Sequence, residues 1–272
     1  MSGLREHRTR APNWLRQVLA HPRVVPLTAL LLRARAVQPS ARFLARELLR
    51  RKGLAAYRVR GRPVQVLVRH ATGDPVTLGE VFHERDYVPP AGAIRATPSR
   101  IVDLGANVGY FGAFALTEWP GASVVAYEPD PDNAEVHASA ISLNGLSDRW
   151  ELRRAAASTT QGSVRFHASG DALSHADEEG SLVVRGEDVL PVIAGADLLK
   201  VDIEGGEWAI LEDPRFNASP PRALVLEYHP RGPSHPDPHA DAVRLIRAAG
   251  LTETATIFKR ADGHGMLWAW SK

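Results

Sequence analysis

The chain has 272 residues and a formal net charge of +2; 44% of the residues are hydrophobic and none is cysteine. The hydrophobic content is sufficient for a packed core, and the lack of cysteine excludes disulfides, thiolate metal sites and a cysteine nucleophile. No apolar run is long enough to cross a membrane, so we expect a cytoplasmic protein without a membrane partner.

The first part of the chain is strongly basic. Residues 1–62 carry 15 Lys and Arg against two acids, and the rest of the chain is net acidic. Such an arm can bind nucleic acid, but the sequence has no aromatic-rich RNA platform, and we favour an arginine-rich helical extension docked on an acidic domain. Helices predicted over residues 12–32 and 39–52, the second with Ser40 as N-cap, would leave apolar faces for a homodimer contact or for a cover over a cleft.

The next elements are a hairpin and then alternating strands and helices. Hairpin strands over residues 56–60 and 64–68 precede a helix over residues 78–84, which Thr77 would cap. The first core strand is predicted to begin at residue 101, and further core strands are predicted over residues 123–130, 150–154, 197–202 and 223–228. Helices are predicted over residues 131–143, 205–211 and 238–249. Strands over 163–167 and 181–185 flank a polar loop, residues 168–180, that contains His175. Strands over 253–258 and 266–270 close the chain as a hairpin.

This alternation predicts an α/β fold. We expect a Rossmann-like, doubly wound, mostly parallel sheet with a C-terminal antiparallel β-hairpin and an N-terminal helical extension. The chain divides into a basic helical extension (residues 1–55), a small β/helix entry segment (56–98) and a ligand-binding domain (99–272).

The most informative stretch is DLGANVG at residues 103–109. It predicts a buried strand, a tight turn at Gly105 and the start of a helix whose free N–H groups face a ligand. Asp103 would repel the pyrophosphate of a dinucleotide, whereas it suits a ligand with a cationic amino-acid end. S-adenosylmethionine (SAM) is such a ligand.

Glu128 ends the following apolar strand, 25 positions after Asp103. This offset is close to the roughly 20 residues expected for an acid that binds ribose hydroxyls. Because the carboxyl ends of parallel strands meet at one edge of a sheet, we expect both acids to face one ligand.

A second group of charged residues follows the next two core strands. Lys200, Asp202 and Glu204 alternate and therefore point to the same side of the chain. Glu227 and His229 end the next strand, and both segments should reach the same edge as the glycine turn.

Four motifs together resemble a known family. DxGANxG at residues 103–109, EPxP at 128–131, KxDxEGxE at 200–207 and ExHP at 227–230 are similar to the FkbM-type SAM-dependent methyltransferases. The resemblance covers residues 87–230, about half of the chain. It implies a class I methyltransferase fold and methyl transfer from SAM, and members of this family often O-methylate hydroxyl groups of secondary metabolites or sugars.

The resemblance also implies roles for individual residues. The glycine turn would line the methionine end of SAM, Glu128 would hold the ribose, Ala156 would approach the adenine, and Asp202 would lie beside the methyl group. The predicted cofactor-binding residues are Asp103, Gly105, Ala106, Asn107, Gly109, Glu128, Pro129, Ala156 and Asp202.

Methyl transfer requires an aligned acceptor oxygen and a group that removes its proton. We favour His229 as this general base, because histidine titrates near neutral pH and Glu227 is placed to orient its ring. His175 and Asp202 are the other candidates. This reaction needs no metal, but Asp202, Glu204, Glu227 and His229 form an alternative ligand set for Mg²⁺ or Mn²⁺, through which a catechol or vicinal diol would bind.

The leading hypothesis is therefore an O-methyltransferase that acts on a small molecule in secondary metabolism. N-methylation or carboxyl-methylation of a small molecule or peptide is an alternative, as is an RNA-binding methyltransferase that uses the basic arm. A catalytically inactive SAM-binding protein is a fourth. The acceptor itself stays open.

Overall fold

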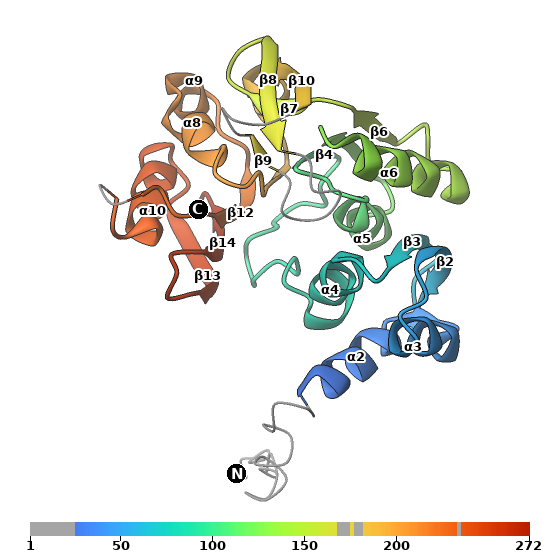
Figure 1. Cartoon of the computed structure of the whole chain (residues 1–272). Coiled ribbons are helices and arrows are strands. Elements are labelled where there is room, and N and C mark those ends of the chain that lie inside the picture. Colours follow the sequence, from blue (N-terminus) through green and yellow to red (C-terminus); the bar gives the residue numbers. More distant parts are fainter. Residues whose placement is uncertain (1–24, 168–174, 177–181, 233–234) are drawn as a thin grey trace, which may run out of the picture.

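The computed structural model describes residues 25–167, 175–176, 182–232 and 235–272. Its centre is a seven-stranded sheet in the order β13-β14-β12-β11-β4-β5-β6 (Figure 1). The strands are β4 (Arg100–Leu104), β5 (Ser123–Tyr127), β6 (Trp150–Arg153), β11 (Leu198–Val201), β12 (Ala223–Tyr228), β13 (Glu253–Lys259) and β14 (Gly265–Trp270). Adjacent strands from β6 to β12 pair in parallel, and β14 pairs antiparallel with both β12 and β13. The predicted mostly parallel sheet and its closing hairpin are confirmed.

Helices cover both faces of this sheet, because alternate strand residues point to opposite sides. Ile101 and Val124 pack into the apolar cluster that contains α5 (Tyr110–Glu118) and α6 (Pro131–Asn144). Val102 and Leu199 pack on the other face. That face is covered by α7 (Leu190–Ile193), α8 (Glu207–Glu212), α9 (Pro214–Ala218) and α10 (Pro238–Ala248).

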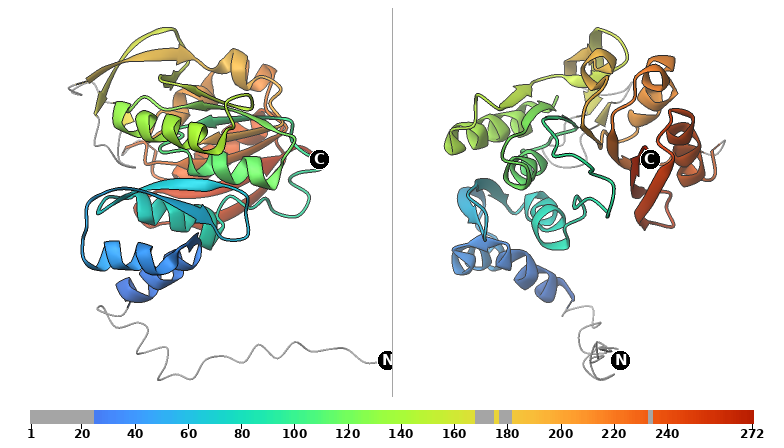
Figure 2. Two further views of the ribbon diagram at one scale, coloured as in Figure 1. Left: turned by 90° about the vertical axis from the view of Figure 1, so that its right-hand side faces the viewer. Right: turned by 180° about the vertical axis from the view of Figure 1, so that it is seen from behind.

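A second, small sheet packs against α5 and α6 (Figure 2). It has the order β1-β2-β3; one helix precedes β1, and a second helix connects β1 to β2. The elements are α2 (Val25–Arg35), β1 (Val37–Gln38), α3 (Ser40–Leu48), β2 (Gly53–Val59) and β3 (Gln65–His70). The Tyr110 hydroxyl on α5 donates to the Leu67 carbonyl oxygen on β3 at 2.9 Å. The predicted hairpin is confirmed, and the expected segment boundary after residue 55 falls inside β2.

Two local expectations in this region are wrong. The helix expected over residues 78–84 instead begins at Asp74, as α4 (Asp74–Gly79), and continues into the π-helical turn η1 (Glu80–Glu84). Arg69 binds the Asp74 carboxylate at 2.8 Å, which fixes this earlier start, and Thr77 caps nothing. Pro39, and not Ser40, is the N-cap of α3; the Ser40 hydroxyl donates to the Val37 carbonyl oxygen.

A third sheet, in the order β7-β10-β8-β9, extends beyond the main sheet. It contains β7 (Ala156–Ser158), β8 (Gly162–His167), β9 (His175–Ala176) and β10 (Leu182–Asp188). The strands predicted over residues 163–167 and 181–185 are confirmed as β8 and β10, which pair antiparallel. The strand β7 was not predicted. Most of the expected polar loop lies outside the described residues. No described helix is long and apolar enough to cross a membrane.

Candidate active site

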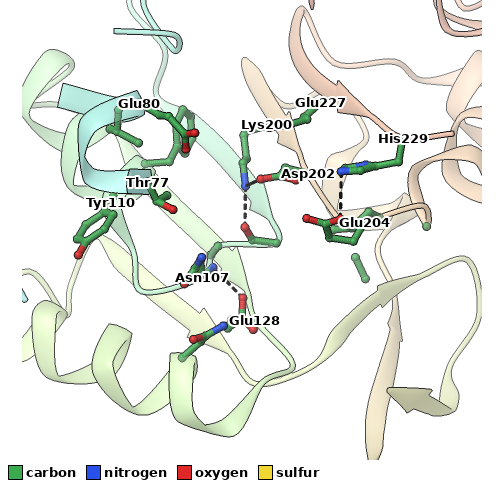
Figure 3. A pocket seen from close by; sticks show the side chains of 18 of the residues that line it. Thr77, Glu80, Asn107, Tyr110, Glu128, Lys200, Asp202, Glu204, Glu227 and His229 are labelled. Carbon is green, nitrogen blue, oxygen red and sulfur yellow. Dashed lines mark hydrogen bonds and ion pairs between the residues drawn. The ribbon is translucent and has the colours of Figure 1, made fainter. Parts of the chain in front are cut away.

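A cavity of about 350 Å³ opens at the carboxyl ends of β4, β5, β11 and β12. It brings together most of the residues singled out in the sequence (Figure 3). Those that line it are Gly105, Ala106, Asn107, Glu128, Pro129, Ala156, Asp202, Glu204, Glu227 and His229. Asp103 and Gly109 are not among the described lining residues, and the side chain of His175 lies outside the described part of the chain.

The turn after β4 needs glycine at its first position. Gly105 has a φ of +77°, and a Cβ added to it would lie 1.7 Å from the Asp202 carbonyl oxygen. Asn107 is also left-handed, with a φ of +49°, a conformation that asparagine tolerates better than most residues. The turn therefore runs directly against the end of β11 and directs the Asn107 N–H into the cavity region.

Gly109 has a packing role. Its φ is +91°, and an added Cβ would lie 2.7 Å from the His137 ring and 2.9 Å from the Trp150 ring. Both rings are buried under α5 and α6. The expectation that Gly109 lines the cofactor pocket is therefore not met by its position.

Glu128 is held in place by backbone donors. It is 4% exposed, and its carboxylate accepts N–H bonds from Asn107 at 2.7 Å and from Asp130 at 2.8 Å. Burial raises the pKa of Glu128 to about 7 although these two hydrogen bonds act in the opposite direction. A carboxylate has about four acceptor positions, so roughly two are left for a ligand.

A buried ion pair lies under the floor of the cavity. Asp103 and Lys200 face each other across the β4–β11 pair, with Nζ 3.3 Å from Oδ1. Lys200 also donates to the Gly105 carbonyl oxygen at 2.6 Å and lies 3.5 Å from the Asp202 carboxylate. Burial raises the pKa of Asp103, and Lys200 counteracts this. Burial alone would lower the pKa of Lys200, but Asp103 and Asp202 raise it above its usual value. Asp103 thus positions Lys200, which lines the cavity.

His229 is enclosed by carboxylates. Glu207 accepts from the His229 backbone N–H at 2.8 Å and from Nδ1 at 3.2 Å, and Nε2 lies 3.2 Å from the Glu204 carboxylate. Burial by itself would lower the pKa of His229, but Glu207, Asp202 and Glu204 raise it to about 9. Glu207, and not Glu227 as expected, orients the ring, because Glu207 lies fully buried at the start of α8.

The opposite wall is acidic, and apart from Glu227 its residues were not singled out in the sequence. Glu80 and Tyr87, which follow α4, line the cavity together with Glu227 from β12 and Arg260 after β13. The same four residues line a neighbouring cavity of about 290 Å³. Burial and the Asp202 charge raise the pKa of Glu227 to about 8, and burial and Asp86 raise that of Glu80. Glu227 belongs to the ExHP motif, but no motif marks Glu80, Tyr87 and Arg260, because they come from segments outside the βα units.

The strand order, with its glycine turn and acids on one sheet edge, is the Rossmann-like fold of class I methyltransferases. The structure of methyltransferase FkbM from Methylobacillus flagellatus KT matches it with a TM-score of 0.50 and 14% identity, over 91% of this chain and 59% of that chain. EvdMO1 matches with a TM-score of 0.44 and 17% identity, over 84% and 46%. The chain therefore spans about three fifths of the first protein and less than half of the second.

The methyltransferase FkbM domain matches residues 103–250, which is more than half of the chain. The chain belongs to this family, as its four motifs predict. A search of the curated proteins found no match.

Proposed function

We propose that this protein transfers the methyl group of SAM to a hydroxyl oxygen of a small-molecule acceptor. The observation that carries the proposal is the separation of two groups of acids along one cavity. Glu128 lies at one end and Asp202 and Glu227 lie toward the other, with Asn107 of the glycine turn between them (Figure 3). Pro129 and Ala156 also line this cavity, and Lys200 lies beside Asp202.

In this proposal SAM lies across the glycine turn. The two free acceptor positions of Glu128 take the ribose hydroxyls, which are hydrogen-bond donors. Pro129, Ala156 and Ala157 provide an apolar surface for the adenine. Asp202, whose side chain is 27% exposed, offers its carboxylate to the amino group or to the region of the sulfonium.

The reaction is an in-line displacement at an activated donor. The protein has to align the acceptor oxygen with the methyl carbon and accept its proton. In our proposal Glu227 accepts this proton, in place of His229. Both ring nitrogens of His229 already face carboxylates, Nδ1 that of Glu207 and Nε2 that of Glu204. Glu227 lines the cavity, and the positive charge of bound SAM would lower its raised pKa of about 8 toward neutrality.

The charges of the cavity favour some acceptors over others. The carboxylates of Asp202 and Glu204 would repel a carboxylate or a phosphate, which argues against carboxyl-methylation and against an RNA acceptor. They tolerate a neutral hydroxyl compound, and product analysis distinguishes an O-methyl from an N-methyl product. A role in secondary metabolism, a cytoplasmic location and a homodimer through the N-terminal helices stay predictions.

Calorimetric titration with SAM and with S-adenosylhomocysteine tests the cofactor. We expect saturable binding of both, and a dissociation constant at least about tenfold higher for Glu128→Gln, which keeps the shape but loses the charge. The matched control is Glu135→Gln, an exposed acid on α6. If the folded wild type binds neither compound, the proposal is wrong.

The acceptor is sought with a panel of sugars, polyols, phenols and amines, with transfer of one methyl group followed by mass spectrometry. With the first acceptor found, Glu227→Gln should lower kcat by roughly 10²-fold or more, with little change in SAM affinity. An unchanged kcat in this variant would return the role of proton acceptor to His229 or Asp202.

A further inference from the structure

Three side chains that can ligate a metal meet at one side of the cavity. Asp202 and Glu204 follow β11 and His229 follows β12, and one ligand atom from each lies within 4.8 Å of the other two. Nε2 of His229 is 3.2 Å from the Glu204 carboxylate (Figure 3). We call these three residues the carboxylate–histidine cluster.

The imidazole of His229 is oriented from behind the cluster. Glu207 is fully buried, and it accepts hydrogen bonds from the His229 N–H and Nδ1 and from the Gly205 N–H. With the Nδ1 proton held by Glu207, Nε2 is the ring nitrogen that faces the other two side chains. A carboxylate commonly fixes the tautomer and the ring direction of a metal-ligating histidine in this way.

The cluster is open toward the cavity. The side chains of Asp202 and Glu204 are 27% and 26% exposed, and both line the same cavity as Glu128. A Mg²⁺ ion usually keeps several positions for water or substrate oxygens and takes only one or two carboxylates from the protein. The cluster therefore has the donors and the free space that such an ion needs.

Tyr87 places a further polar group in the same cavity. The residue is 6% exposed and lines the cavity, and its hydroxyl makes no hydrogen bond with the described residues. The hydroxyl oxygen is not among the buried unpartnered atoms, so it is accessible from the cavity and available to donate to a ligand oxygen beside the cluster.

We infer that the carboxylate–histidine cluster binds one Mg²⁺ or Mn²⁺ ion, which receives two neighbouring oxygens of the acceptor. The acceptor class is then a vicinal diol or a catechol, and this inference rests on the proposed function. Coordination makes one acceptor hydroxyl more acidic, and its proton passes to Glu227. The oxygen–carbon bond forms as the carbon–sulfur bond of the sulfonium breaks, and S-adenosylhomocysteine leaves as a neutral thioether.

Manganese binding is measured on the full chain after treatment with EDTA, without SAM or acceptor. Electron paramagnetic resonance during titration with MnCl₂ should show one bound ion per chain, displaced by Mg²⁺, with coupling to an imidazole nitrogen in pulsed spectra. Asp202→Asn and Glu204→Gln should each raise the dissociation constant by about tenfold or more. Glu212→Gln, a partly exposed acid on α8, is the matched control and should leave it unchanged.

The competing explanation is an ion pair between a protonated His229 and its carboxylates. It predicts either no saturable Mn²⁺ binding, or Mn²⁺ binding that shows no nitrogen coupling and has the same dissociation constant in Asp202→Asn, Glu204→Gln and Glu212→Gln. Either result overturns the inference. Circular dichroism verifies the fold of each variant, and Glu204→Gln serves if Asp202→Asn does not fold. Because SAM is absent, failure here leaves the proposed function standing. Loss of SAM binding with Mn²⁺ binding retained would refute the proposed function alone.

Discussion

Glu128 links the charge of a single residue to cofactor binding. Burial raises its pKa to about 7, so the carboxyl group is largely neutral in mildly acidic solution. Ribose hydroxyls donate to the ionised form, and a lower pH should therefore weaken binding. We expect the dissociation constant for SAM to rise by up to about tenfold per pH unit below pH 7 and to level off above about pH 8. Calorimetry across this range checks it, and a flat profile for the wild type would contradict it.

Gly105 shows why the turn after β4 tolerates no side chain. A Cβ there would lie 1.7 Å from the Asp202 carbonyl oxygen at a φ of +77°. We expect Gly105→Ala to lower the free energy of unfolding by about 3 kcal/mol or more and to weaken SAM binding, since the end of β11 must move. The control is Gly121→Ala, where an added Cβ meets nothing within 4 Å. Chemical denaturation measures both, and equal stability of the two variants would refute this explanation.

Among the elements, β4 and β11 depend on the charge pair between them. Asp103 is 0% exposed and Lys200 is 3% exposed. We expect Lys200→Met to lower the free energy of unfolding by about 3–5 kcal/mol, because it leaves a buried carboxylate uncompensated. The double variant Asp103→Asn with Lys200→Met should recover part of that loss. Urea unfolding compares the three proteins, and a double variant less stable than Lys200→Met would contradict this account.

Two apolar residues that the sequence places on the same face of the predicted helix, Phe43 and Leu49, differ in burial. Phe43 is fully buried between α3 and the small sheet, whereas Leu49, at the end of α3, is 62% exposed. We expect Phe43→Ala to cost about 3–5 kcal/mol of unfolding free energy and Leu49→Ala to cost less than about 0.5 kcal/mol. Thermal unfolding of both variants gives the comparison. Similar losses would mean that Leu49 is covered in solution.

For the whole molecule, His137 couples stability to acid. It is fully buried beside Trp150, with ring centroids 5.0 Å apart, and burial lowers its pKa to about 3. In the unfolded chain the His137 ring takes up a proton near pH 6.5, whereas in the folded chain it stays neutral down to about pH 3. The contribution of neutral His137 to the free energy of unfolding is therefore complete above pH 6.5 and is lost as the pH falls from 6.5 toward 3. We expect a loss of roughly 1.4 kcal/mol per pH unit over this range.

The variant His137→Phe should flatten this dependence, and His83→Phe, a partly exposed histidine on η1, is the control. Urea unfolding between about pH 4 and about pH 7 measures the slope for each protein. A slope in His137→Phe equal to that of the wild type would show that other groups cause the acid sensitivity.

The sheet, its glycine turn and the acids on one edge can be predicted from the amino-acid sequence alone. These features are local: short apolar strands, a glycine with a positive φ and a Pro-started helix such as α6 are each specified by adjacent residues. The acids at the strand ends meet at one edge of the sheet because parallel strands bring their carboxyl ends together. The four motifs at residues 103–109, 128–131, 200–207 and 227–230 therefore indicated the family as well as much of the cavity lining.

The partner that each of these side chains contacts depends on the three-dimensional packing. Asp103 turned out to be buried beneath Lys200, and Glu207 took the role expected of Glu227 beside His229. Tyr87 and its acidic neighbours entered the site from the segment after α4, which no motif marks. The reason is physical: burial, charge pairing and cavity walls depend on contacts between segments far apart in the chain, and no spacing along the sequence specifies them.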